Sequence, residues 1–353
     1  PFLGVGDSTQ VSYGRTSSGG ADEWECSDPT VVLAGKVITC RTSQGVGKGL
    51  SFIVSIGKRP QNELWTQSTN VLHMPNVKHS LPSVTAAIVA EDLATVGGEE
   101  VTIVGENFGP FGYDVSGSYG KYHFTDCDLV VEHTKIVCQS NEGIGVDHEV
   151  AVVVGEQDSI RTNDDDSPTV SYRPPAIFPM AGFANAASGP GLTGASTKGG
   201  QALYIHGNNF GPKVNEQSPT LRYGEFDTGY PSDDIYVAGN CQVSVAHTVI
   251  SCMTVEGTGY DHDIVITVGG LDSNKYAANM SYSPPTLMSY ETQWNDGVGV
   301  SRTLAGIDGA FTAGGEWVLL KGQDFGTVAQ NKISSVTYGD NGMEFIACKD
   351  EVT

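Results

Sequence analysis

The sequence predicts an all-β protein built from tandem β-sandwich domains. Two observations predict this class: a glycine-rich phrase that recurs in fixed phase, and strands whose alternate residues are always apolar. The phrase contains two glycines, a short apolar run, a further glycine and a Phe-Gly pair, which falls at 108–109, 210–211 and 325–326. Because a fixed period indicates an array of like units, we expect a series of similar domains rather than one large domain.

The strands themselves are predicted by side-chain alternation. Residues 52–56, 150–154 and 264–268 occupy the same place in the repeat, and every second residue in them is large and apolar. A period of two with one apolar face is typical of a half-buried strand. Tyr-Gly pairs at 13–14, 119–120, 223–224 and 338–339 give a repeat period of about 105 residues. No stretch shows a comparable helical period.

Proline pairs mark the expected domain junctions. Pro174-Pro175 and Pro284-Pro285 follow a Ser-Tyr-x motif, and Pro82 marks the weakest copy. Proline cannot donate to a strand ladder and extends the residue before it, so it ends one sandwich and stiffens the entry to the next. The sequence predicts complete domains at 81–173 and 174–283. It also predicts a partial domain at 1–80 that lacks its first strand or strands, and one at 284–353 that lacks its last strands.

The order of these motifs resembles the IPT/TIG family of immunoglobulin-like domains. The order is Gly-Gly, an alternating apolar strand, Gly-x-Asn-Phe-Gly, Tyr-Gly, Cys, a strand ending in Cys, Gly-x-Gly, an apolar strand and Ser-Tyr-x-Pro-Pro. The resemblance covers nearly the whole chain and implies tandem immunoglobulin-like β-sandwiches arranged as beads on a string. The family occurs in plexins, fibrocystin-like and microbial surface proteins and some transcription factors. It therefore implies a fold and leaves the function open.

The cysteines are expected to form disulfides within each repeat. Zinc is the alternative, but it prefers CxxC-type spacing with histidines nearby, which the chain does not show. Disulfides imply an oxidising compartment, so we expect a protein that is secreted, extracellular or at the cell surface. Cys348 would pair with a cysteine outside this segment. The expected pairs are Cys26 with Cys40, Cys127 with Cys138, and Cys241 with Cys252.

Charge excludes several classes of partner. The formal net charge is −22, with only 19 Lys and Arg residues spread along the chain. Binding to nucleic acid or to anionic lipid needs clustered basic residues, so neither is expected.

No apolar run approaches the roughly 20 residues of a membrane helix, so no direct membrane insertion of this segment is expected. We expect no enzyme activity, since no histidine stands with Ser or Cys in a nucleophile motif.

Four charged or glycine-rich runs are candidate ligand sites. Asp-His-Glu at 147–149 and Asp-His-Asp at 261–263 precede the core strands, but adjacent strand residues point to opposite faces, so a solvated strand start is expected. Three aspartates at 164–166 leave calcium open, although an acidic hairpin tip is the expected role. The run 45–50 resembles a phosphate loop but leads into a strand. No metal site and no cofactor are predicted.

Asn279 begins an Asn-Met-Ser sequon and is the candidate glycosylation site, so an N-glycan is the one covalent group expected. The stretches 180–198 and 293–313 are long for connections within a sandwich. Long ordered loops are often functional, so we expect these two to be contact surfaces between domains or subunits.

These features favour a non-enzymatic structural subunit of an extracellular or cell-surface filament or array. Copies of the chain would assemble head to tail, and neighbouring copies would complete the incomplete ends. The alternative is an ectodomain segment of a plexin- or fibrocystin-like receptor or adhesin, in which the domains act as spacers. A carbohydrate-binding module is a third class, but the four tryptophans fall at unrelated positions of the repeat.

Overall fold

In the computed structural model the chain consists of strands joined by turns, with no helix among the described residues. The predicted all-β class is confirmed. The chain divides into two compact units, Pro1–Tyr172 and Arg173–Thr353. The four-domain division stays a prediction, and we use first, second, third and last domain for strands β1–β6, β7–β15, β16–β27 and β28–β32. The structure describes residues 8–14, 24–57, 66–67, 77–160, 167–178, 184–185, 189–190, 193–213, 218–226, 235–295, 301–305, 317–328, 333, 335–339 and 345–346.

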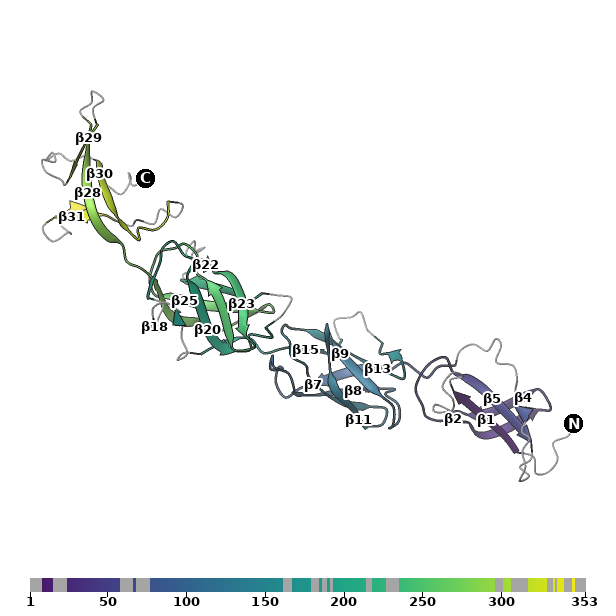
Figure 1. The fold of residues 1–353 in the computed structure, drawn as a ribbon. Coiled ribbons are helices and arrows are strands. Elements are labelled where there is room, and N and C mark those ends of the chain that lie inside the picture. The colour runs from purple at the N-terminus through teal and green to yellow at the C-terminus, as the bar shows by residue number, and fades with distance from the viewer. Residues whose placement is uncertain are drawn as a thin grey trace. The chain divides into compact units, whose positions relative to one another are not determined.

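The second domain is a sandwich of two antiparallel sheets (Figure 1). One sheet has the order β11-β12-β8-β7; the other has the order β10-β9-β13-β14, with β15 paired to β13. The core lies between them, where residues of both sheets, such as Ile103 and Val152, are fully buried. The strands are β7 (Ser83–Ile88), β8 (Glu100–Glu106), β9 (Val115–Tyr119), β10 (Tyr122–His123), β11 (Thr125–Val131), β12 (Lys135–Gln139), β13 (His148–Val154), β14 (Gln157–Asp158) and β15 (Thr169–Val170).

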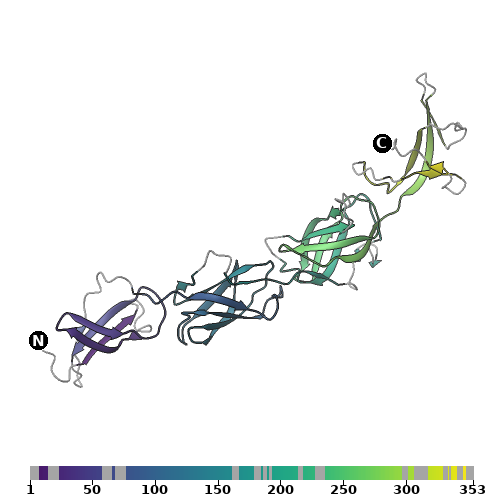
Figure 2. The ribbon, with the colours of Figure 1, turned by 180° about the vertical axis from the view of Figure 1, so that it is seen from behind.

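The third domain, drawn in green and seen from behind in Figure 2, repeats this arrangement. Its sheets have the orders β16-β20-β24-β23 and β19-β27-β25-β21-β22, with β26 on β25, and β17 pairs with β18. The parallel strand β19 comes from the stretch 180–198. The strands are β16 (Ala176–Ile177), β17 (Ala184–Asn185), β18 (Gly189–Pro190), β19 (Thr193–Ala195), β20 (Ala202–Asn208), β21 (Thr220–Gly224), β22 (Ile235–Val237), β23 (Gly239–Val245), β24 (Val249–Met253), β25 (His262–Val268), β26 (Leu271–Asp272) and β27 (Tyr276–Tyr282).

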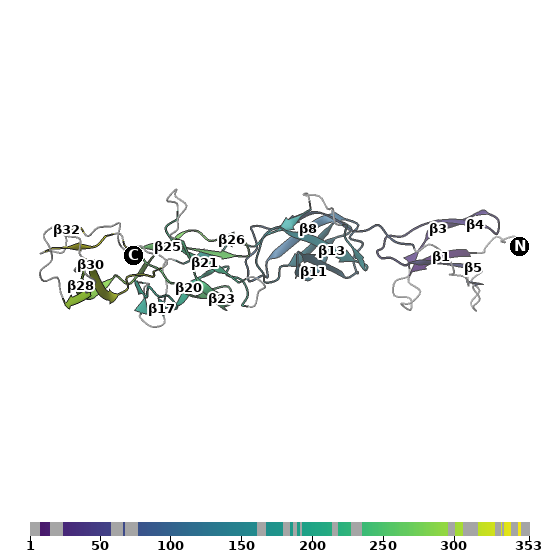
Figure 3. The same ribbon diagram turned by 90° about the horizontal axis from the view of Figure 1, so that it is seen from above.

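The first domain has one four-stranded sheet and one hairpin. Figure 3 shows the hairpin β3-β4 on one side and the sheet β2-β1-β5-β6 on the other. Among the described residues, β4 pairs only with β3. The strands are β1 (Ser8–Gly14), β2 (Trp24–Glu25), β3 (Ser27–Leu33), β4 (Val37–Arg41), β5 (Ser51–Gly57) and β6 (Thr66–Gln67).

The last domain contains the sheet β29-β28-β30 and a separate short pair, β31-β32. In the described part of this domain, β30 pairs only with β28. Part of the stretch 293–313 forms strand rather than loop, since β28 pairs there with β29. The strands are β28 (Thr286–Asn295), β29 (Ser301–Ala305), β30 (Trp317–Gln323), β31 (Thr337–Tyr338) and β32 (Phe345–Ile346).

The recurrent glycine phrase has a steric cause. A Cβ built on Gly105 would lie 2.0 Å from the carbonyl oxygen of Ser83 and 2.5 Å from Cζ of Phe108. The phenylalanine folds back over the strand that precedes it, and the neighbouring strand approaches too closely for any side chain at the glycine. Gly207 and Phe210 repeat the arrangement, with the corresponding distance to Phe210 Cζ at 2.4 Å. The phrase therefore encodes a specific strand-to-turn geometry.

Candidate functional site

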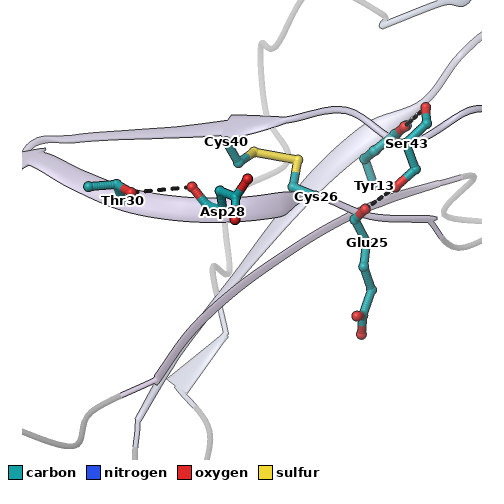
Figure 4. Close-up of a disulfide and its surroundings, with 7 residues drawn as sticks. All are labelled: Tyr13, Glu25, Cys26, Asp28, Thr30, Cys40 and Ser43. Atoms are coloured by element: carbon teal, nitrogen blue, oxygen red, sulfur yellow. Dashed lines mark hydrogen bonds between the residues drawn. A yellow bond between two sulfur atoms is a disulfide. The ribbon is translucent and has the colours of Figure 1, made fainter.

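Each of the first three domains carries a disulfide across a hairpin. Cys26 and Cys40 join the start of β3 to β4, with their Cα atoms 5.6 Å apart (Figure 4). Beside them, the Tyr13 hydroxyl donates a hydrogen bond to the Ser43 carbonyl at 2.8 Å. The other two bridges join Cys127 to Cys138 and Cys241 to Cys252, with Cα separations of 4.0 and 4.1 Å. Cys348 lies outside the described residues.

A buried tyrosine pair closes one end of the second domain. The hydroxyl groups of Tyr119 and Tyr172 lie 2.7 Å apart, and Tyr172 donates to the Asn141 carbonyl at 2.8 Å. Burial raises the pKa of both phenols, so both stay protonated at neutral pH. The third domain repeats the pair, with the hydroxyls of Tyr223 and Tyr282 at 2.9 Å. These pairs link the Tyr-Gly strand to the Ser-Tyr motif at the end of each domain.

A histidine ring packs against each tyrosine pair. In the third domain, His262 is 4 % exposed, and its ring centroid lies 5.5 Å from that of Tyr236 and 5.9 Å from that of Tyr282. Its Nε2 faces the Thr258 carbonyl at 3.1 Å, so this nitrogen must carry the proton. Burial lowers the pKa of His262, and likewise that of His148 in the second domain. The imidazoles therefore serve as neutral core groups that hold the Gly-x-Gly loop.

The prediction that the runs at 147–149 and 261–263 are solvated strand starts is wrong for their histidines, His148 and His262. His148 begins β13 and lies in phase with Val150 and Val152, whose side chains form the core. Because strand residues of equal parity share a face, the histidine must point inward as well. His262 stands in the same relation to β25. That parity was visible in the sequence and would have identified the buried ring of His262 and the half-buried ring of His148.

The neighbouring aspartates have a backbone role. Asp147 and Asp261 both have a φ of 54°, and their amides donate to the hydroxyls of Ser171 and Ser281, each at 3.0 Å. The imidazoles turn into the core, so carboxylate and imidazole do not converge on a shared point. The acidic run at 164–166 lies outside the described residues.

The Gly-x-Gly loop of the first domain inserts its central residue into the second domain. Val46 is 5 % exposed and belongs to the core of the second domain. Gln157 clamps the loop: its Oε1 accepts from the Gly47 amide at 3.0 Å, and its Nε2 donates to the His79 carbonyl at 3.2 Å. A Cβ on Gly109 would lie 2.1 Å from Val46 Cγ1. The run that resembles a phosphate loop is thus an interdomain joint, a role that its resemblance to a phosphate loop did not indicate.

A second joint uses the same positions of the repeat. In the unit Arg173–Thr353, a Cβ on Gly326 of the last domain would lie 2.7 Å from Cγ2 of Thr258, the central residue of the third domain's Gly-x-Gly loop. Thr197 donates to the Asp324 carboxylate at 3.2 Å beside it. In both joints a loop residue contacts the glycine of the next Phe-Gly pair. The sequence signal for both joints was an apolar or small residue between two glycines, at the same position of each repeat.

Within the described ranges, β30 and β4 each pair along one edge only, and their inner-face residues are partly exposed. Val318 of β30 is 39 % exposed, whereas Val101 and Leu203, at the same repeat position, are fully buried. In the first domain, Ile38 and Cys40 of β4 are only half-buried, although their equivalents in β12 and β24 belong to buried cores. Ile38 and Cys40 still pack against the core cluster of the first domain, formed by Val11, Tyr13, Cys26 and Leu50.

The candidate glycosylation site has its backbone in β27. Asn279 precedes Met280, which is fully buried and pairs across the sheet with His262. Its side chain lies outside what the structure describes, and the glycan stays a prediction. No helix long and apolar enough to cross a membrane occurs in the described part of the chain.

Several solved structures show low overall similarity to this chain. The extracellular region of plexin A4 is 15 % identical over 86 % of this chain and 26 % of its own, with a TM-score of 0.25. Invasin, a bacterial integrin-binding protein, is 11 % identical over 84 % of this chain and 56 % of its own, with a TM-score of 0.23. The Escherichia coli adhesin FdeC is 12 % identical over 78 % of this chain and 83 % of its own, with a TM-score of 0.22.

The chain thus spans about a quarter of the plexin region and just over half of invasin. No curated protein was found to match it. The model of the IPT/TIG domain matches residues 84–167 and 191–287, which together make up just over half of the 353 residues. These segments fall on the two sandwiches that carry the paired tyrosines and the inward-facing histidines. The chain therefore belongs to the IPT/TIG family and consists of tandem immunoglobulin-like domains.

Proposed function

We propose that this protein is a non-enzymatic structural subunit of an extracellular or cell-surface array, in which copies of the chain join head to tail through the exposed inner-face residues of β30 and β4. One observation carries the proposal: inner-face positions that are buried in the middle domains are exposed in β30 and half-exposed in β4. Exposed apolar core positions and open strand edges are costly in water and favour pairing with another strand.

The disulfides support an extracellular location. Disulfides such as these three hairpin bridges persist where the surroundings are oxidising, whereas reducing compartments keep cysteines as free thiols. The net charge of −22 fits a surface that repels nonspecific partners and so leaves association to specific strand edges. A heterologous contact between two different ends propagates as a filament when the rotation does not close a ring.

The test is the association state of the secreted chain. We expect its mass by light scattering to rise with concentration and negative-stain images to show linear assemblies. A matched variant, Val318→Asp, places a charge on the open inner face and should reduce assembly, while Val130→Asp, on an exposed position of the second domain, should not. A strictly monomeric chain at all concentrations would refute the proposal.

The joints support a second candidate, a spacer segment of a plexin- or fibrocystin-like receptor or adhesin. Val46 buried in the second domain and Thr258 against Gly326 resist free rotation of neighbouring domains, which is what a spacer that presents a distant site requires. This function needs no association between copies. A chain that is monomeric at every concentration would favour it over the array.

A further inference from the structure

The first domain has a histidine where the second and third domains have a buried tyrosine. The His79 amide donates to the Gly47 carbonyl at 2.9 Å, and the Tyr172 amide donates to the Gly145 carbonyl at the same distance. Tyr282 makes the equivalent bond in the third domain, again at 2.9 Å. His79 therefore occupies the repeat position of the tyrosine that closes one end of each middle domain.

The Nε2 atom of His79 takes the place of the tyrosine hydroxyl. A Cβ on Gly45 would lie 2.9 Å from this nitrogen, and a Cβ on the equivalent Gly143 would lie 2.4 Å from the Tyr172 hydroxyl. That hydroxyl is satisfied, because it lies 2.7 Å from the Tyr119 hydroxyl. His79 Nε2 is also buried, but it has no hydrogen-bond partner within the described residues. A buried polar atom without a partner in the protein is one sign of a site for an ion.

This nitrogen borders a pocket at the joint between the first and second domains. The pocket has a volume of about 170 Å³, and its lining includes Gln44 and His79 on one side of the joint and Asn107 and His133 on the other. His133 Nε2 lies 3.4 Å from Gln44 Oε1. Two imidazoles, one from each side of the joint, therefore line the same pocket.

The available donor atoms suit a divalent transition metal. Imidazole nitrogens are ligands for Zn²⁺ and Cu²⁺, whereas Ca²⁺ and Mg²⁺ prefer sets of oxygen ligands. Asn107 donates through Nδ2 to the Leu81 carbonyl at 3.1 Å, which leaves its Oδ1 as an oxygen ligand. No group of three or more His, Cys, Asp or Glu residues that could hold a metal lies in the described part of the chain. Amide oxygens and water would therefore complete a set that contains two imidazoles.

Other contacts of the joint already hold His79 against the second domain. Gln157 binds both the Gly47 amide and the His79 carbonyl, at 3.0 and 3.2 Å. Trp24 Nε1 donates to the Tyr113 hydroxyl at 2.9 Å, and the Trp24 ring packs edge-on against the His79 ring. Because these contacts fix the backbone and the ring of His79, little conformational freedom would be lost when an ion binds.

We propose that this pocket binds one divalent transition-metal ion of the Zn²⁺ and Cu²⁺ class through Nε2 of His79 and Nε2 of His133. Gln44 Oε1, Asn107 Oδ1 and water supply the oxygen ligands. Because its ligands come from both sides of the joint, the ion stabilises the packed arrangement of the two domains. The site needs no association between copies. Sequence spacing could not predict it, since the two histidines lie far apart along the chain.

Calorimetric titration of the whole chain with Zn²⁺ and with Cu²⁺ tests the site. Every variant carries Cys348→Ser, since a thiolate would bind both ions. We expect one ion per chain, with Cu²⁺ bound more tightly than Zn²⁺ and no competition from Ca²⁺. His79→Tyr introduces the residue of the other two domains, and His133→Asn introduces a residue that tolerates the φ of 65°. Each should weaken Zn²⁺ binding about tenfold or more.

A matched variant separates this site from binding at surface histidines. His247 occupies the hairpin position of the third domain that His133 occupies in the second, with a φ of 63°. His247→Gln should leave the affinity for Zn²⁺ unchanged. Urea unfolding without metal should be the same for His133→Asn as for the parent, so that a loss of affinity reports binding rather than folding.

Trp24 gives an independent readout of where the ion lies. Bound Cu²⁺ quenches the emission of a nearby indole, and the ring centroids of Trp24 and His79 are 5.6 Å apart. We expect Cu²⁺ to quench part of the tryptophan emission, and a large excess of Zn²⁺ to reverse the quenching. Trp24→Tyr, which introduces the residue of the equivalent Tyr122, should lose this quenching and still bind Zn²⁺.

Three results would overturn the proposal. The first is a chain that binds neither ion at millimolar concentration. The second is a loss of affinity in His247→Gln equal to that in His133→Asn, which would indicate adventitious ions only. The third is full affinity in either His79→Tyr or His133→Asn, which would show that the ion does not bridge the joint.

Discussion

Val46 of the first domain lies against Gly109 of the second, so close that a Cβ on the glycine would be 2.1 Å from Val46 Cγ1. No residue with a side chain fits at position 109 beside Val46. The contact also places the Val46 side chain of the first domain in the core of the second. A flexible connection would not need such a fit. The joint is therefore a packed element of the fold.

Replacement of Gly109 by alanine should weaken this joint. The new methyl group would overlap Val46, and the residue has a φ of +82°, which disfavours side chains. We expect a loss of about 1 to 3 kcal/mol in the stability of the second domain, measured by urea unfolding. Gly112→Ala is the matched control, since Gly112 has a φ of +93° but nothing within 4 Å of its Cβ position. Equal losses in both variants would contradict the packed joint.

Removal of the Tyr172 hydroxyl should destabilise the second domain. Tyr172→Phe deletes one of the two hydroxyl groups that donate to the Asn141 carbonyl and removes the bond between the two tyrosines, while the Tyr119 hydroxyl keeps its bonds to the Asn141 carbonyl and amide. The loss of a hydrogen bond whose partners stay satisfied costs about 0.5 to 1.5 kcal/mol. Tyr260→Phe, at a residue that is 76 % exposed, should leave the unfolding midpoint unchanged. Indistinguishable midpoints for the two variants would argue against a structural role for the hydroxyl pair.

The hairpin disulfides should stabilise their own domains. The double variant Cys127→Ala, Cys138→Ala opens a loop with a sequence separation of 11 residues, for which chain entropy predicts a loss of about 3 kcal/mol. Thermal unfolding of the second domain reports the change. The third domain, with its bridge intact, serves as the internal control and should unfold as before. An unchanged second domain would mean that the bridge contributes nothing to its stability.

Acid should destabilise the third domain through His262. Burial lowers the pKa of His262 in the folded protein, although the carboxylates of Glu225, Asp261 and Asp263 act in the opposite direction. In the unfolded chain this histidine has a pKa of about 6.5, so below that pH the unfolded state binds more protons than the folded state. The contribution of the neutral ring to folding stability is therefore complete above pH 6.5 and is lost as the pH falls below it.

Unfolding of the third domain measured between pH 8 and pH 5 tests this sign. His262→Gln should flatten the dependence in this window, whereas His123→Gln, at an exposed position of the second domain, should leave it as in the parent chain. Stability that rises as pH falls through 6.5 would show that the ring is charged in the folded state.

The sequon predicts a glycan on Asn279 when the chain is made in a secretory pathway with N-glycosylation. Intact mass before and after enzymatic release of N-glycans should differ for the parent chain. Asn279→Gln should abolish the difference, and Asn141→Gln, which lies in no sequon, should retain it. An identical mass before and after release would leave the sequon unused.

Much of the fold could be predicted because its signals are local. The alternation of Val150, Val152 and Val154 sets the buried face of β13, whatever the rest of the chain does. The hairpin that brings Cys127 to Cys138 needs only a short turn between two adjacent strands. By contrast, the extension of β28 to Asn295 was not predicted, since it depends on pairing with β29 across a long connection.

The candidate site could likewise be predicted only in part from the sequence. The parity of His148 with the core valines was available in the sequence, yet which polar group the ring would meet was not, because Ile144, Tyr122 and Tyr172 come from other elements. For Val46, even the domain that buries it could not be read from neighbouring residues.

The sequence by itself determined the strands, the turns, the hairpin bridges and the family, since these depend on residues that are close along the chain or repeat in phase. Only the tertiary structure decided that Val46 enters the neighbouring core and that His262 points among three tyrosines. The physical reason is that burial and edge pairing depend on distant segments meeting in space, and no local pattern specifies which surfaces meet.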